Sequence, residues 1–353
     1  MSAAGRSERG GGGVNAAGAE WTRRGRGERG GGGVNAPLVV GARRSPLSRA
    51  QATWVGGRLR ERWPELPIEY RFISTAGDRD PRTPLPEIGG KGLFTEDLER
   101  ALREGDIDVA VHSLKDLPAD LPDGLMLGAV SSREDPRDVL VVRDSLVSAP
   151  READGRRLLQ RLPFGARVGT SSLRRAAQLR ASRADLDPRP IRGNVDTRLR
   201  KLEDGGFEAL VLAAAGLRRL GLRPRGAYVL DGRWLPAPGQ GALGLQCRAG
   251  EDPMATRVQA LDDPTARREV TAERALLAAL EGGCRVPIAA RASLRGEELR
   301  LRAAVYDVDG GPPVEAADTG SGSSAFLLGR RLADRMLAAG ASRLVERARR
   351  LSP

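Results

Sequence analysis

From residue 37 onward, short apolar strands alternate with amphipathic helices, and loops rich in Gly, Ser, Thr and Arg join them. Strands are expected at 38–42, 68–73, 107–111, 166–169, 190–192 and 207–212. A helix is expected to begin at Ser45-Pro46 and continue through 51–62, and further helices are expected at 92–103, 173–180, 195–202 and 213–220. Alternation of this kind predicts mostly parallel sheets that bind ligands at the carboxyl ends of their strands. Because the pattern occupies two separate stretches, we expect an α/β fold with two lobes and a ligand cleft between them.

The two ends of the chain depart from this pattern. Residues 1–36 hold a near-exact direct repeat rich in Gly and Arg, and so few apolar residues that we expect a disordered extension. The Pro/Gly-rich segment 235–248 is interpreted as a crossing back between the lobes followed by one more strand. Beyond it, a helix at 266–280, a half-exposed strand at 299–306 and a final helix carrying Leu328, Leu332 and Met336 predict a small α+β domain.

Charge and composition narrow the possible functions. There are 58 Lys and Arg residues against 46 Asp and Glu, a net charge of +12, which favours an anionic ligand. Two cysteines and one histidine exclude a disulfide framework and a Cys/His zinc site, and no metal is expected. The longest apolar run, residues 209–217, is too short to span a bilayer, so no membrane association is expected.

Three of the expected strand-to-helix junctions combine arginine with small hydroxyl residues or Gly. They contain Arg43 with Ser45, the segment 170–175, and the segment 192–198. Helix amino termini carry unpaired N–H groups and bind carboxylates or phosphates, although Ser and Thr there also serve as ordinary helix caps. The junctions together predict a ligand with several negative groups, while the absence of a Walker-type loop weakens a nucleotide interpretation.

Three further positions are candidates for chemistry. Lys115 and Asp116 follow a buried strand, where an aspartate can stabilise a cation or take a proton, or can form a plain surface ion pair. Cys284 follows two glycines and is either an accessible thiolate or an incidental free cysteine, whereas Cys247 sits in an apolar run typical of a core. Lys91, between glycines, is typical of a mobile lid or of a plain helix lead-in.

These stretches together resemble the hydroxymethylbilane synthase family, also called porphobilinogen deaminase. The similarity runs from about Leu38 to the last helix, and all its motifs occur in one order. The motifs are RRSPLSRAQ (43–51), IGGKGLFTEDLE (88–99), AVHSLKDLP (110–118), REDPRD (133–138), VGTSSLRR (168–175), RGNVDTRL (192–199), AGLRRLG (215–221), PGQGALG (238–244) and EGGCRVP (281–287).

The resemblance implies a fold and a reaction. It implies two lobes like type II periplasmic binding proteins, domain 1 at 37–136 and 237–262 and domain 2 at 137–236, with a third domain at 263–353. The implied enzyme is a transferase of tetrapyrrole and haem biosynthesis. It joins four porphobilinogen molecules head to tail onto a dipyrromethane cofactor with loss of ammonia, and then releases hydroxymethylbilane by hydrolysis.

The resemblance also assigns roles to the candidates. Cys284 would hold the dipyrromethane covalently through a thioether, and Asp116 would be the catalytic carboxylate. The cofactor's carboxylates would be held by Lys115, Thr170, Ser172, Arg174 and Arg175. Substrate or the growing chain would be held by Arg43, Ser45, Lys91, Arg192, Arg198 and Arg219. Some relatives have lysine where this chain has Glu87, which affects a peripheral lid contact.

Two other classes of protein share part of this pattern. A non-catalytic binding protein would use the same two-lobed fold without needing Cys284 or Asp116. A nucleic-acid-binding protein would fit the basic composition, but aromatic residues make up 3% of the chain and the arginines do not gather in one stripe, so nucleic acid is not an expected partner. The family further implies a monomer, and a reactive thiol favours the cytoplasm.

Overall fold

The computed structural model describes residues 13–14, 20–21, 36–75, 95–146, 154–250, 253–281 and 286–351. Residues 1–36 form a unit separate from residues 37–353. In the first unit, β1 (Gly13–Val14) and β2 (Glu20–Trp21) form a short antiparallel pair that the sequence did not predict. The rest of the expected extension, the lid at Lys91 with Glu87, and the attachment residue Cys284 lie outside the described residues.

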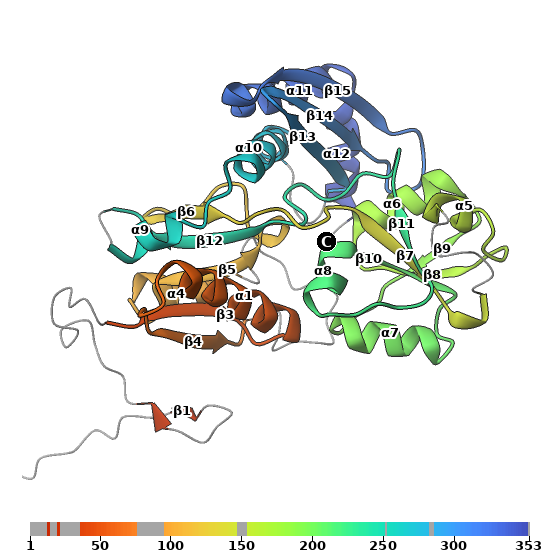
Figure 1. Cartoon of the computed structure of the whole chain (residues 1–353). Helices are drawn as coiled ribbons and strands as arrows, with labels where there is room; N and C mark the ends of the chain where they lie inside the picture. Colours follow the sequence, from red (N-terminus) through yellow and green to blue (C-terminus); the bar gives the residue numbers. More distant parts are fainter. Residues whose placement is uncertain are drawn as a thin grey trace, which may run out of the picture. The chain divides into compact units, whose positions relative to one another are not determined.

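The first large sheet is built from both ends of the α/β region. Its order is β4-β3-β5-β12-β6, in which β3 is parallel to β4 and β5 while β12 is antiparallel to β5 and β6 (Figure 1). The strands are β3 (Leu38–Arg43), β4 (Ile68–Ile73), β5 (Val109–Ser113), β6 (Leu125–Val130) and β12 (Leu243–Arg248). The helices that accompany it are α1 (Pro46–Arg62), α4 (Glu96–Arg103) and α9 (Pro253–Gln259).

The second large sheet lies within the middle of the chain. Its order is β11-β7-β10-β8-β9, with β8 parallel to β9 and β10, and β7 antiparallel to β10 and β11. The strands are β7 (Asp138–Val142), β8 (Arg167–Gly169), β9 (Asp187–Arg189), β10 (Ala209–Ala213) and β11 (Ala227–Leu230). The helices are α5 (Gly155–Leu159), α6 (Leu173–Ser182), α7 (Val195–Glu203) and α8 (Ala214–Arg219).

The two sheets share one strand order when the second is listed from β9 as β9-β8-β10-β7-β11. In each, the fourth strand, β12 or β7, is antiparallel to its neighbours and follows a segment that crosses between the lobes. Residues 131–137 lead from β6 to β7, and residues 231–242 lead back from β11 to β12. The expected α/β fold class is confirmed, with mixed sheets and a small sheet domain at the C-terminal end. The expectation of mostly parallel sheets is wrong, since two of the four pairings in each sheet are antiparallel.

The C-terminal part is a three-stranded antiparallel sheet covered by helices. Its strands are β13 (Ile288–Arg295), β14 (Glu298–Val305) and β15 (Val314–Ser321), and its helices are α10 (Pro264–Ala279), α11 (Ala325–Ala338) and α12 (Ala341–Arg350). Leu328, Leu332 and Met336 of α11 are buried in its core, as their spacing predicts. The helix that carries them is not the last one, because Gly340 at φ 95° turns the chain into α12.

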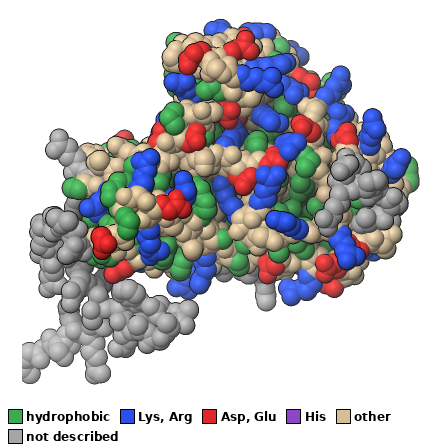
Figure 2. All heavy atoms as spheres, in the orientation of Figure 1, with side chains coloured by type: hydrophobic (Ala, Val, Ile, Leu, Met, Phe, Trp, Pro, Cys, Tyr) green, Lys and Arg blue, Asp and Glu red, His purple; other side chains and the backbone are tan. Residues whose placement is uncertain are grey.

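Most predicted elements are present, and one is displaced. The strand expected at 190–192 is wrong, because β9 lies three residues earlier and includes Pro188. A proline fits this place because β9 is an edge strand with a single neighbour. Every helix in the described ranges is too short or too polar to span a membrane. On the face drawn in Figure 2, Lys and Arg side chains are spread widely among Asp and Glu side chains.

Candidate functional site

The first arginine-bearing junction joins β3 to α1. Arg43 is the last residue of β3, and Ser45 caps α1, since its Oγ accepts a hydrogen bond of 3.2 Å from the Ser48 N–H. A small cavity beside this junction is lined by Arg43, Ser48, Thr95, Val111, His112, Ser113 and Asp116. The structure therefore brings predicted residues Arg43 and Asp116 to one cavity and gives Ser45 a capping role.

Lys115 and Asp116 lie in a 3-10 turn directly after β5. The Lys115 Nζ donates a 3.2 Å hydrogen bond to the Oε1 of Gln240, and the Asp116 side chain is exposed. Desolvation lowers the pKa of Lys115 to about 8, against the opposing attraction of the neighbouring Asp116. Lys115 is therefore held by Gln240 of the crossing segment, residues 231–242.

Gln240 stands between two glycines that the crossing requires. Gly239 and Gly241 have φ values of 73° and 94°, and a Cβ on Gly241 would lie 2.2 Å from the carbonyl oxygen of Glu134. The Gln240 amide donates to the Pro136 carbonyl at 2.7 Å and to the Asp138 carboxylate at 2.9 Å. Gln240 thus links Lys115, beside the first sheet, to Asp138 at the start of β7.

Asp138 is fully buried and holds two of the predicted cofactor-binding residues. Its carboxylate accepts from Arg174 Nη1 at 2.8 Å, from Arg175 Nη2 at 2.7 Å and from Trp234 Nε1 at 2.9 Å. The two guanidinium groups hold the pKa of Asp138 well below its usual range, although burial alone would raise it. Arg174 and Arg175 open α6, so this cluster fixes the start of that helix.

Thr170 and Ser172 lie in the same junction, between β8 and α6. The Thr170 Oγ1 accepts a 3.2 Å hydrogen bond from the Ser172 N–H, and Thr170 is buried. Ser172 is the N-cap residue of α6 without a side-chain capping bond. The structure therefore places all four predicted residues of the segment 170–175 at one helix start.

Near this helix start, Arg198 lies close enough to Arg175 and Arg192 for the three positive charges to interact. The Nε of Arg198 donates to the Gly193 carbonyl at 2.8 Å. Desolvation lowers the pKa of Arg198 to about 10, and repulsion from Arg175 and Arg192 adds to the shift. Cations held together in this way create a positive field suited to an anionic ligand.

Arg219, at the end of α8, is tied to the crossing segment. Its Nη2 donates to the Gly241 carbonyl at 2.6 Å, and desolvation lowers its pKa to about 10, opposed by Glu134. Asp138 and Gln240 were missed as site residues in the sequence analysis. They occur inside the quoted motifs REDPRD and PGQGALG, but their contacts are not local. Asp138 binds Arg174, which lies 36 positions later, and Gln240, which lies 102 positions later.

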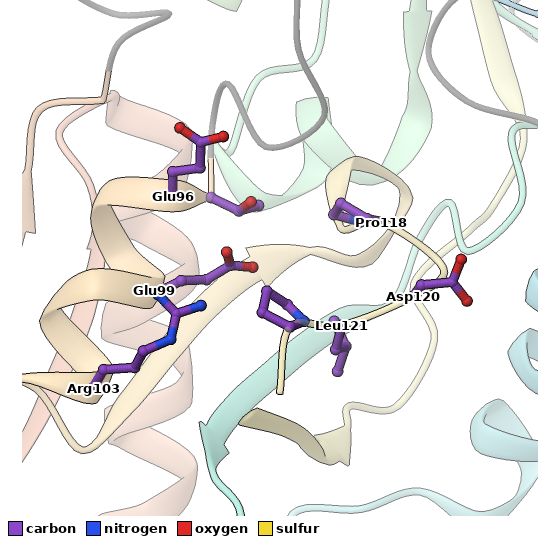
Figure 3. Close-up of a pocket in the computed structure, with 8 residues that line it drawn as sticks. Glu96, Glu99, Arg103, Pro118, Asp120 and Leu121 are labelled. Atoms are coloured by element: carbon purple, nitrogen blue, oxygen red, sulfur yellow. The ribbon is translucent and has the colours of Figure 1, made fainter. Parts of the chain in front are cut away.

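A larger cavity of about 400 Å³ lies between α4 and the segment 118–122 (Figure 3). It is lined by Thr95, Glu96, Glu99, Arg103, Pro118, Asp120, Leu121 and Pro122. Thr95 borders both cavities. Within the described residues, no group of three or more His, Cys, Asp or Glu side chains could hold a metal ion.

Comparison with known families decides which protein family this site belongs to. A family model described as porphobilinogen deaminase, dipyromethane cofactor binding domain, matches residues 38–256, and one described as porphobilinogen deaminase, C-terminal domain, matches residues 267–338. The chain belongs to the porphobilinogen deaminase family. The resemblance seen in the sequence is thereby confirmed, and the dipyrromethane is the cofactor after which the larger matched domain is described.

Curated porphobilinogen deaminases are similar over almost their whole length. The enzyme of Desulforudis audaxviator is 47% identical over 313 residues, covering 88% of this chain and 98% of the relative. That of Pelobacter propionicus is 45% identical over 310 residues, covering 88% and 96%. These similarities place the protein among the enzymes of tetrapyrrole synthesis.

Solved structures resemble the chain more weakly. The LysR family transcriptional regulator CbnR covers 66% of this chain and 69% of its own at 11% identity and a TM-score of 0.41. A periplasmic binding protein from Brucella ovis covers 69% of each chain at 16% identity and a TM-score of 0.36.

Proposed function

We propose that this porphobilinogen deaminase is a transferase that condenses four porphobilinogen molecules head to tail, with loss of ammonia, and releases hydroxymethylbilane by hydrolysis. The observation that carries the proposal is the half-buried Arg198, which lies beside Arg175 and Arg192 and has no carboxylate partner among the described residues. Each pyrrole of the substrate bears an acetate and a propionate. Arg forks pair with such carboxylates bidentately, and each pair formed would relieve the repulsion among the cations.

The residues present fit a dipyrromethane. That group carries several carboxylates, and the described residues offer Lys115, Arg192 and Arg198, together with the N–H groups and hydroxyls at the start of α6. We assign the holding of the cofactor to Lys115, Thr170, Ser172, Arg174 and Arg175, and its thioether attachment to Cys284. When bound, the dipyrromethane supplies the terminal pyrrole carbon to which the first substrate is joined.

Asp116 carries the chemistry in this proposal. Loss of ammonia from porphobilinogen leaves an electron-poor cation, and a carboxylate aimed at the pyrrole N–H stabilises that positive charge. The same carboxylate accepts the proton released as the new carbon–carbon bond forms. Asp116 and Arg43 line the same cavity. Arg43 can therefore hold a carboxylate of the substrate while Asp116 contacts the pyrrole ring of the substrate.

Substrate and growing chain are assigned to the remaining cations and to the cap residue. These are Arg43, Ser45, Lys91, Arg192, Arg198 and Arg219. We further propose that domain 1 comprises 37–136 and 237–262, domain 2 comprises 137–236 and domain 3 comprises 263–353, with the ligand cleft between the first two. A thiol that must stay reduced until it is alkylated favours the cytoplasm as the place of work, and the enzyme acts as a monomer.

The test is turnover by the purified chain. Incubation with porphobilinogen should release ammonia and hydroxymethylbilane in a ratio of four to one, and Asp116→Asn should abolish most of the turnover. A non-catalytic binding protein, the other class that this fold suits, would bind porphobilinogen and return it unchanged. Unchanged substrate after prolonged incubation with the intact chain would contradict the proposed reaction.

A further inference from the structure

A buried polar chain runs from the cavity at Asp116 into the first sheet. His112, on β5, places its Nε2 at 3.0 Å from the Oε1 of Gln246 on β12. The Nε2 of Gln246 then donates to the Oε1 of Glu99 on α4 at 3.3 Å. His112 and Glu99 are each 5% exposed and Gln246 is completely buried.

The direction of these hydrogen bonds is fixed from the Glu99 end. The Oε1 of Glu99 accepts from the amide nitrogen of Gln246, so the amide oxygen of Gln246 faces His112. An oxygen acceptor at Nε2 requires that this nitrogen carry the proton. In the neutral ring, the proton is therefore on Nε2 and the lone pair is on Nδ1.

The surroundings keep the ring neutral. Burial lowers the pKa of His112 to about 4, and the charge of Arg43 adds to the effect while the bond to Gln246 opposes it. The charged groups at the cavity are Arg43 and Asp116, with Glu99 behind Gln246. Among the described residues, the His112 ring is hydrogen-bonded to Gln246, and this bond is made at Nε2.

The charged side chains of the site supply more hydrogen-bond donors than acceptors. Arg and Lys side chains are donors only, so Arg43, Lys115 and Arg198 suit the substrate's carboxylates and leave its own N–H groups without a partner. Among the residues that line the cavity, Asp116 supplies a carboxylate acceptor, Ser48, Thr95 and Ser113 supply hydroxyls that both donate and accept, and a neutral His112 adds the lone pair of Nδ1.

We propose that Gln246 and Glu99 hold His112 as the Nε2–H tautomer, so that its Nδ1 accepts a hydrogen bond from an N–H group of the pyrrole substrate beside Asp116. The assignment of this donor rests on the proposed function, whereas the tautomer rests on the two hydrogen bonds of Gln246 and on the neutral state of the ring. His112 is then a residue that binds substrate, and Gln246 and Glu99 are positioning residues that act through it.

The tautomer can be measured without any assay of activity. His112 is the single histidine of the chain, so an untagged, uniformly ¹⁵N-labelled protein gives one pair of imidazole nitrogen signals. At pH 7 the proposal requires a protonated Nε2, recognised by its coupling to both ring carbon-bound protons, and an unprotonated Nδ1. A protonated Nδ1, or a ring charged at both nitrogens, would overturn it. The Gln246→Met variant should weaken the preference for Nε2–H, since it removes the oxygen acceptor.

Two substitutions separate binding at Nδ1 from support at Nε2. The amide of Asn reaches the place of Nδ1 and keeps an acceptor there, while that of Gln reaches the place of Nε2 and keeps the link to Gln246. We expect His112→Gln to lower kcat/KM by about tenfold or more, with His112→Asn losing less than about threefold. The reverse order would assign His112 a structural role and overturn the proposed contact with substrate. Wild-type turnover, measured alongside, reports separately on the proposed reaction.

Discussion

Replacing Asp138 with asparagine should cost more stability than any exposed ion pair of this protein contributes. The substitution keeps the shape of the side chain but leaves Arg174 and Arg175, which are 5% and 7% exposed, without a counter-charge. Removing one partner of a buried ion pair costs about 3–5 kcal/mol, because the other charge stays buried and unpaired. The new amide would also direct N–H donors at guanidinium groups that can only donate.

The matched control is Asp187→Asn. Asp187 pairs with Arg189 at 2.6 Å, but the Arg189 side chain is 62% exposed, so the pair contributes about 0.2–1 kcal/mol. Urea unfolding of both variants, followed by tryptophan fluorescence, should give a free energy of unfolding lowered by about 3–5 kcal/mol for Asp138→Asn and by less than about 1 kcal/mol for the control.

Acid provides an independent check on the same carboxylate. Because the folded-state pKa of Asp138 is depressed, its contribution is complete above the ordinary aspartate value of about 3.9 and is lost as the pH falls below it. The wild-type free energy of unfolding should therefore fall more steeply between about pH 5 and pH 3 than that of Asp138→Asn. An Asp138→Asn variant within about 1 kcal/mol of wild type at pH 7, with the same acid slope, would show that Asp138 is not the counter-charge that stabilises Arg174 and Arg175.

Three further predictions concern the charges at the site. Arg198→Gln should leave the unfolding midpoint unchanged or raised, since it relieves repulsion from Arg175 and Arg192, and should lower kcat/KM by about tenfold or more. A loss of stability with unchanged kcat/KM would contradict the proposed role of Arg198 in binding substrate. Asp116→Glu should keep partial turnover while Asp116→Asn loses far more, and equal rates in the two would rule out the proposed role. The free energy of unfolding of the wild type should rise relative to that of Lys115→Met between about pH 8 and pH 10, because the unfolded chain retains a lysine proton that the folded protein has released. A difference between the two proteins that does not change with pH would count against the lowered pKa of Lys115.

The local pattern of the chain predicts which segments become strands and helices, but not how strands pair. Strand β12 was expected after the crossing, yet its place between β5 and β6, antiparallel to both, depends on residues more than 100 positions earlier. Strand β9 was misplaced because an edge strand of Asp, Pro and Arg buries too little to show an apolar pattern. Cys247, by contrast, lies in the core as its apolar neighbours predict.

The site shows the same division between local and distant information. The junctions that carry Arg43, Arg174 and Arg198 could be identified from arginines next to helix starts, which is a local signal. The partners that fix these residues could not, because Asp138 and Gln240 look like ordinary polar residues until the crossing segments meet. His112 was noted only as the single histidine, and its role depends on Gln246 from a strand 134 positions later.

The most direct test of the proposed function is the mass of the purified protein, followed by peptide mapping of residues 281–287. We expect an adduct equal to two linked pyrroles on Cys284, absent from Cys284→Ser and lengthening in whole pyrrole steps when porphobilinogen is added. A protein whose mass is unmodified, and stays unmodified after incubation with porphobilinogen, would contradict the covalent transferase chemistry on which the proposed function rests.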